Sequence, residues 1–232
     1  MHRFQGIYDR AARRKGGEKA LQQLLSSPKP PAELEKISAD RYLAMMTKCI
    51  NRAGFNWKVI DNKWPEFEQA FFGFNIDTLL MLSDEQWEAY MQDRRVVRNW
   101  QKIKTVRDNA RFIHELGLSN DESKKGSISK LIAHWPPTDQ IGLHRFLKEH
   151  GSRLGGQTCR YFLRAMGKDG FILSRDVMSA LISAGLDIKE PASSQRDMTR
   201  IQQLFNLWHT ESGLPFTHLS MIASFSCGDN LT

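Results

Sequence analysis

The chain has 232 residues, of which 41% are hydrophobic, enough to bury the core of one large domain or two small ones. Its 33 lysines and arginines exceed its 26 aspartates and glutamates, and this net charge of +7 favours a polyanionic partner, although such an excess can also lie on solvated faces. The odd number of cysteines (Cys49, Cys159 and Cys227) argues against a disulfide framework, and no segment approaches the roughly 20 apolar residues of a membrane span, so we expect a cytoplasmic protein without membrane attachment.

Helical periodicity recurs along the chain and alternating strand patterns are almost absent, which predicts an all-α fold. The first clear helix is expected to begin after Ser38, which is a plausible N-cap, and to end or bend at Gly54. Its buried face is predicted to consist of Tyr42, Met45, Met46, Cys49, Ile50 and Ala53.

Three further helices follow in chain order. Ser83 and Gln86 have the spacing of a capping box, in which each side chain bonds the other residue's backbone N–H. Apolar residues at three-to-four spacing predict a helix over 103–113 with a basic flank, and another over 198–208. We expect residues 1–35 to form an N-terminal extension packed on the body, 36–222 to form the helical body, and 223–232 to be a flexible tail.

The segment 148–177 predicts a helical hairpin, because Leu154, Gly155 and Gly156 separate a polar helix from an apolar one that begins near Thr158. Glycines allow close approach of a partner, and the N–H groups at the start of the second helix suit a phosphate. The alternative is a simple turn between helices without a ligand.

Three sequence blocks, in the same order, resemble the DNA-3-methyladenine glycosylase I family of the helix-hairpin-helix DNA glycosylase superfamily. The first, Arg52 to Asn75, contains an Ala-Gly-x-x-Trp segment. The second, Arg95 to Ile113, matches through Val96, Val97, Arg98, Lys102, Ile103, Asn109, Ala110 and Arg111. The third is the hairpin with its following loop. The resemblance covers about Ser38 to Leu186 and implies a helix-hairpin-helix glycosylase-like helical bundle.

The resemblance also implies roles for individual residues. Main-chain groups of Leu154, Gly155, Gly156 and Thr158 would anchor the DNA backbone, and Arg98 and Lys102 are candidate phosphate contacts. In the base pocket, Trp57 would stack on the extruded base beside Asn56 and Cys49. A buried core tryptophan is the alternative interpretation of Trp57.

The sequence departs from the family at two sites. The base-recognising glutamate of the family falls at Cys49, which cannot supply a carboxylate to a cationic base and which also lies on the apolar stripe, where an inert buried thiol is the alternative. The family's structural zinc ligands have no counterparts here. We therefore expect a divergent member without metal or other cofactor.

For catalysis, the resemblance places Ser174 where related enzymes carry an aspartate, and Asp176 is the nearest carboxylate candidate for stabilising the sugar cation. The alternative is that Ser174 caps a helix and Asp176 is an acid of its first turn. No lysine occupies the position that lyase-type relatives use in the hairpin loop, so strand cleavage is not expected.

The resemblance thus implies a monofunctional, monomeric DNA glycosylase of base excision repair that acts on double-stranded DNA with alkylated, 3-methyladenine-like bases. Two alternatives stay open. One is a non-catalytic protein of the same fold that binds DNA or lesions. The other is a helical protein-interaction module in which Trp57, Trp64 and Trp135 are core or interface aromatics.

Overall fold

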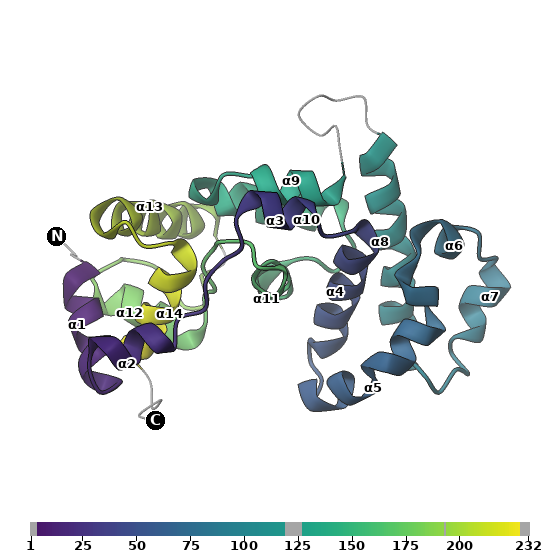
Figure 1. Cartoon of the computed structure of the whole chain (residues 1–232), viewed down its shortest axis with the longest axis horizontal. Helices are drawn as coiled ribbons and strands as arrows, with labels where there is room; N and C mark the ends of the chain where they lie inside the picture. The colour runs from purple at the N-terminus through teal and green to yellow at the C-terminus, as the bar shows by residue number, and fades with distance from the viewer. Residues whose placement is uncertain (1–3, 119–126, 193, 228–232) are drawn as a thin grey trace. The chain divides into compact units, whose positions relative to one another are not determined.

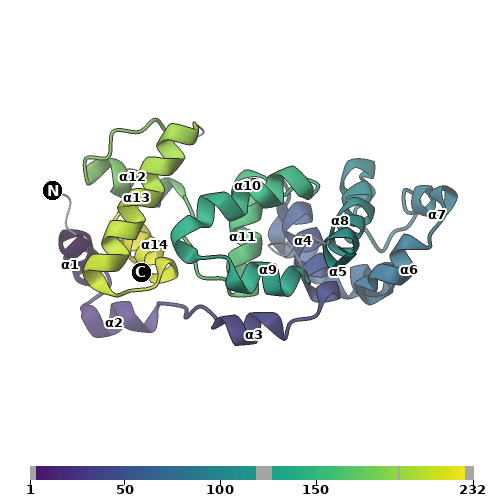
Figure 2. The same ribbon diagram turned by 90° about the horizontal axis from the view of Figure 1, so that it is seen from above.

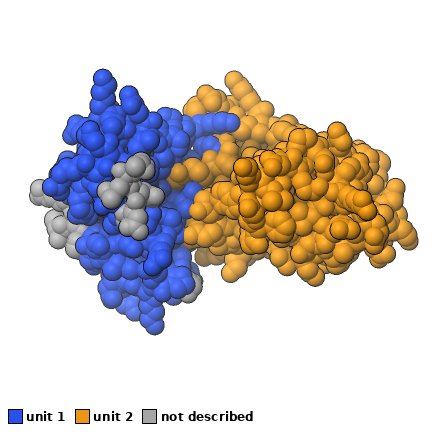
Figure 3. Space-filling model, turned by 90° about the horizontal axis from the view of Figure 1, so that it is seen from below, with its two compact units in different colours: residues 1–29, 136–142, 167–232 blue, residues 30–135, 143–166 orange. Residues whose placement is uncertain are grey.

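The computed structural model describes residues 4–118, 127–192 and 194–227. Within these ranges the regular elements are helices and no strand occurs, which confirms the predicted all-α class (Figures 1 and 2). Contacts divide the chain into two compact units that alternate along the sequence (Figure 3). Unit 1 contains residues 1–29, 136–142 and 167–232, and unit 2 contains residues 30–135 and 143–166.

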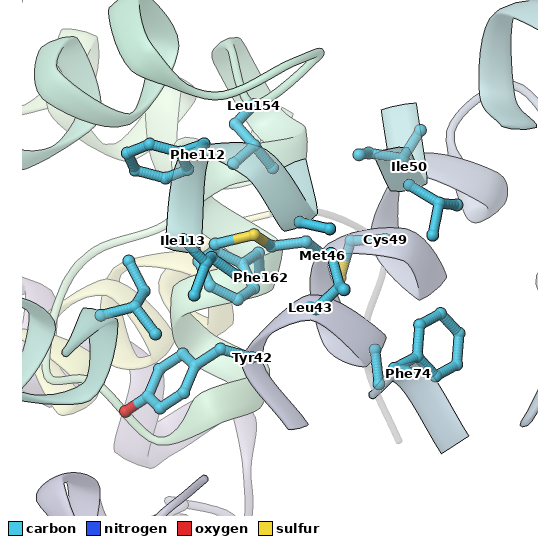
Figure 4. Packing of buried hydrophobic residues seen from close by; sticks show 14 of the residues in the cluster. Tyr42, Leu43, Met46, Cys49, Ile50, Phe74, Phe112, Ile113, Leu154 and Phe162 are labelled. Atoms are coloured by element: carbon cyan, nitrogen blue, oxygen red, sulfur yellow. The ribbon is translucent and has the colours of Figure 1, made fainter. Parts of the chain in front are cut away.

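Unit 2 is a bundle built around α4 (Ala39–Arg52), which packs against α8 (Trp100–Leu118) and α11 (Gly156–Met166). Figure 4 shows Tyr42 and Met46 of α4 pointing into the same apolar cluster as Phe162 of α11. The other elements of unit 2 are α3 (Pro31–Glu35), α5 (Trp57–Ala70), η1 (Phe72–Phe74), α6 (Ile76–Leu80), α7 (Asp84–Ala89), α9 (Ile128–His134) and most of α10 (Gln140–His150).

The helix starts of unit 2 follow local signals. The Ser83–Gln86 capping box at the start of α7 is confirmed, since Ser83 Oγ accepts from the Gln86 amide and Gln86 Oε1 accepts from the Ser83 amide. Ser38 stands at the N-cap of α4 as predicted, but its side chain makes no capping bond to the backbone. Asn56 caps α5 by accepting from the Lys58 amide at 3.0 Å.

Unit 1 gathers around α14 (Phe216–Ser226), which packs against α1 (Phe4–Arg14), α12 (Arg175–Ser183) and α13 (Gln195–Ser212). Phe171 and Phe205 stack at 4.3 Å between ring centroids in its core. The remaining elements of unit 1 are α2 (Glu18–Gln23) and η2 (Pro137–Asp139).

The helix α14 differs from the expectation of a tail over 223–232. Residues 223–226 continue α14, and Ala223 is fully buried, whereas residues 228–232 lie outside the described part of the chain. The sequence did not indicate this helix because α14 has no amphipathic periodicity. It contacts three other helices and is therefore apolar on several faces. The predicted boundaries at residues 35 and 222 also do not coincide with the two units. Among the described helices, none is long and apolar enough to cross a membrane.

Candidate functional site

The connector between α4 and α5 forms one wall of the candidate site. After Arg52 the chain turns at Gly54, whose φ of +69° is a left-handed conformation that glycine adopts readily. Lys102 of α8 reaches this turn, and its Nζ donates to the carbonyl oxygens of Asn51 at 2.9 Å and Ala53 at 3.0 Å. The ammonium also lies 5.4 Å from the Phe55 ring centroid. Lys102 therefore bonds carbonyls at the end of α4 and fixes the turn.

This placement does not favour the predicted phosphate contact of Lys102. Its side chain is buried and already holds two carbonyl oxygens, and burial lowers its pKa. Arg98, the other predicted phosphate contact, is exposed in the segment before α8, and its role stays a prediction.

A pocket of about 700 Å³ opens between this connector and α11, entirely within unit 2. The predicted base-binding residues Cys49, Asn56 and Trp57 all line it, and so does Thr158 of the hairpin. The other lining residues are Arg52, Ala53, Gly54, Phe55, Gln157, Tyr161, Arg164 and Ala165.

Exposed aromatic side chains dominate the pocket. Trp57 is 45% exposed, so it is not the buried core residue of the alternative interpretation. Its indole meets the Tyr161 ring edge-to-face at 5.2 Å between centroids, and Phe55 is also exposed on the connector. Contiguous exposed apolar rings mark a binding surface more often than single ones do, and these rings form a surface suited to a flat, apolar ligand.

Arg52 places a cation on this aromatic surface. Its guanidinium carbon lies 5.1 Å from the Trp57 ring centroid, within the range of a cation–π contact. The same guanidinium pairs with Asp61 of α5, which also accepts from Lys48 Nζ at 3.0 Å. The hydrogen bond from Arg52, followed by that from Lys48, lowers the pKa of Asp61, so this carboxylate stays ionised at neutral pH.

Cys49 lines the pocket as a neutral thiol. Its side chain is 5% exposed, and burial raises its pKa to about 11 despite the nearby cations of Arg52 and Lys48. Both sequence interpretations thus hold in part, because the thiol is buried and un-ionised at neutral pH yet lines the pocket. Asn56 uses its side-chain oxygen to cap α5, which leaves the amide as its remaining donor group.

Sequence reasoning missed the face of α11 that completes the pocket. Gln157, Thr158, Tyr161, Arg164 and Ala165 share one side of this helix, at the spacing of residues on one helical face. The opposite side of α11 consists of buried residues, and this apolar side is the feature on which the prediction of the helix was based. The sequence feature that could have indicated this face is Tyr161 followed three residues later by Arg164, because both lie on the side of the helix away from the apolar residues.

The hairpin between α10 and α11 has the predicted glycine turn, and α11 begins at Gly156 rather than near Thr158. Gly156 has a φ of +56° and is exposed, with open space where a Cβ would be. Leu154 is fully buried and so anchors the turn to the core (Figure 4). Gly155 is partly exposed beside Gly156 at the start of α11, where the first backbone N–H groups have no acceptor within the helix.

Asn109 of α8 fixes the other side of the hairpin. Its Oδ1 accepts from the Ser152 amide at 2.8 Å and its Nδ2 donates to the Ser152 carbonyl at 3.1 Å. Ser152 Oγ in addition donates to Asp108 at 3.2 Å. Because Lys102 and Asn109 lie two helical turns apart, one face of α8 holds both the pocket turn and the hairpin.

Asp176 lies in the first turn of α12, where Ser174 Oγ accepts from the Val177 amide at 3.2 Å. This geometry is the helix cap of the alternative interpretation. Asp176 belongs to unit 1, whereas every pocket residue belongs to unit 2. Its catalytic role stays a prediction.

Over the part of the chain that the structure describes, no group of three or more His, Cys, Asp or Glu side chains is arranged to hold a metal ion.

Comparisons with known proteins show what the chain is similar to. The model of the methyladenine glycosylase family matches residues 35–172. Among solved structures, an 8-oxoguanine glycosylase/lyase from Methanocaldococcus jannaschii, in complex with a 15mer DNA containing 8-oxoguanine, is 17% identical and aligns over 94% of this chain and 95% of its own with a TM-score of 0.55, which supports a shared fold.

A 3-methyladenine DNA glycosylase I from Staphylococcus aureus is also similar, at 17% identity over 63% of this chain and 82% of its own, with a TM-score of 0.49. No curated protein matches the chain. The family match spans more than half of the chain and includes α4, the pocket and the hairpin, and the chain therefore belongs to the methyladenine glycosylase family of DNA repair enzymes.

Proposed function

We propose that the chain is a monofunctional DNA glycosylase that hydrolyses the N-glycosidic bond of an alkylated base after extruding it from double-stranded DNA. The extruded base would stack on Trp57 inside the pocket, and the hairpin would hold the DNA backbone. The product would be abasic DNA with an intact strand. We propose that the enzyme acts as a monomer.

The observation that supports this proposal is that the first turn of α11 adjoins both the pocket and the glycine turn of the hairpin. Thr158 and Gln157 line the pocket, and Gly155 and Gly156 directly precede them at the hairpin. A phosphate held by the N–H groups at the start of α11 would leave its own nucleotide, or the adjacent one, within reach of the Trp57 surface. DNA anchoring and base binding are thus joined through one short rigid helix.

The test is base release by the purified wild-type chain, under single-turnover conditions, from duplexes that each carry one methylated base, cationic in some duplexes and neutral in others. Release of a methylated base is expected, with strand breaks appearing only after alkali treatment. Strand cleavage without alkali would contradict the monofunctional assignment. Asp176→Asn tests the predicted carboxylate, and a role in stabilising the sugar cation predicts a loss of about 10²-fold or more in release rate with unchanged DNA affinity.

A second candidate function, binding of DNA lesions without catalysis, is favoured by the neutral thiol of Cys49 where the family has a glutamate. Binding that weakens steeply as salt rises, without release of any base, would support it. Loss of both binding and release would exclude both functions.

A further inference from the structure

The charge of the pocket is the feature that bears on the kind of base it takes. Two arginines, Arg52 and Arg164, line the pocket, and among the described residues that line it none is acidic. Cys49, which also lines the pocket, is a thiol and carries no charge at neutral pH. The lining of the pocket therefore offers a ligand positive charge and hydrogen-bond donors.

Arg52 lies against the aromatic ring on which the proposed base would stack. Its guanidinium carbon lies 5.1 Å from the Trp57 ring centroid, so Arg52 already makes the cation–π contact that this indole could offer a cationic base. A positively charged base stacked in the same pocket would be repelled by this guanidinium.

The nearby acid does not cancel this charge. Asp61 pairs with Lys48 as well as with Arg52, so the three side chains together carry one net positive charge. Asp61 lies outside the lining of the pocket, whereas Arg52 is part of it. The lining of the pocket therefore includes the cation of the pair but not its counter-ion.

We propose that Arg52 makes the pocket select neutral alkylated bases against cationic ones, so that the substrates of this chain are uncharged modified bases. This inference rests on the proposed function and narrows its substrate class. A neutral base can still stack on the open part of Trp57, and its ring nitrogens and carbonyl oxygens can accept hydrogen bonds from donors such as the Asn56 amide.

The experiment compares two duplexes that differ only in the charge of one base. One contains 7-methylguanine, which is cationic, and the other contains 7-methyl-7-deazaguanine, its neutral isostere. Affinity is measured for each duplex and for an unmodified one, at fixed salt, with wild type and with Arg52→Gln and Lys48→Gln. Both variants remove one cation paired with Asp61, but only Arg52 lines the pocket. Base release is not needed for this readout.

Wild type is expected to bind the neutral lesion about tenfold more tightly than the cationic one, a ratio that Arg52→Gln reduces to about threefold or less and Lys48→Gln leaves unchanged. Equal or tighter binding of the cationic duplex by wild type would overturn the inference while leaving the proposed function standing. An equal loss of selectivity in the two variants would overturn the assignment to Arg52. If neither lesion is bound better than unmodified DNA, the proposed function fails together with the inference.

Discussion

Asn109 and Ser152 exchange two hydrogen bonds between α8 and the hairpin, one in each direction. The Asn109 side chain is fully buried, so its amide group has no alternative partner in water. Replacing it leaves the backbone N–H and C=O of Ser152 without these partners, which costs about 1–3 kcal/mol for each buried group left unsatisfied.

Asn109→Leu, which keeps the branching and the number of side-chain heavy atoms, is therefore expected to lower the free energy of unfolding by about 2–3 kcal/mol and to weaken DNA binding. Glu115→Gln, at an exposed site of the same helix, is the control and is expected to change stability by less than about 0.5 kcal/mol. Urea denaturation and DNA titration measure both effects. An Asn109→Leu protein of wild-type stability would show that the pair does not hold the hairpin.

Lys102 is expected to act on the pocket through the turn between α4 and α5. Lys102→Met keeps much of the buried chain but removes the bonds to Asn51 and Ala53, and should destabilise the protein by about 1–3 kcal/mol and reduce lesion affinity. Lys104→Met removes the same charge from an exposed position of α8. If Lys102 were instead a phosphate contact, Lys102→Met would leave the free energy of unfolding unchanged. Lys102→Met and Lys104→Met would then weaken binding to undamaged DNA to different extents.

Much of this arrangement follows from local sequence, and some of it does not. The capping box at Ser83 was predictable because a few neighbouring residues suffice to satisfy the free N–H groups of a helix. The start of α4 after Ser38 was also predicted, although Ser38 makes no capping bond there. The role of Lys102 was not predictable from sequence. A lysine beside other basic residues is normally a solvated cation, and its actual partner, the end of α4, lies about 50 residues earlier in the chain. The Arg52–Trp57–Asp61 contacts depend on the angle between α4 and α5, which sequence spacing does not fix.

Gly156 is expected to matter through its backbone and not through packing. An alanine Cβ would meet open space there, but a φ of +56° costs a residue with a side chain about 1–2 kcal/mol. Gly156→Ala should therefore destabilise the protein by about that amount, while Gly117→Ala, in α8 and also in open space, should stabilise it by up to about 1 kcal/mol. Opposite signs in thermal unfolding are the expected result, and equal effects would contradict the left-handed turn.

The Cys49 thiol is expected to resist alkylation at neutral pH. Its pKa of about 11 means that the reactive thiolate is scarce at pH 8 and rises about tenfold for each pH unit up to that value. Cys227, which is partly exposed, should react first with iodoacetamide, and Cys49 should become as reactive only after unfolding. Peptide mass spectrometry at pH 7 to 10 measures the order, and rapid labelling of Cys49 at pH 7 would indicate an ionised thiol in the pocket.

The most direct test of the account is base release by wild type, Trp57→Ala and Phe72→Ala from a duplex with one neutral alkylated base, at protein concentrations that saturate the DNA. Phe72 is the control, since it is an exposed aromatic of unit 2 that does not line the pocket. Because stacking of a base on an aromatic ring contributes about 1–3 kcal/mol, Trp57→Ala should slow release about 10- to 100-fold, while Phe72→Ala should match wild type. Release at the wild-type rate by Trp57→Ala would contradict the claim that the extruded base enters this pocket.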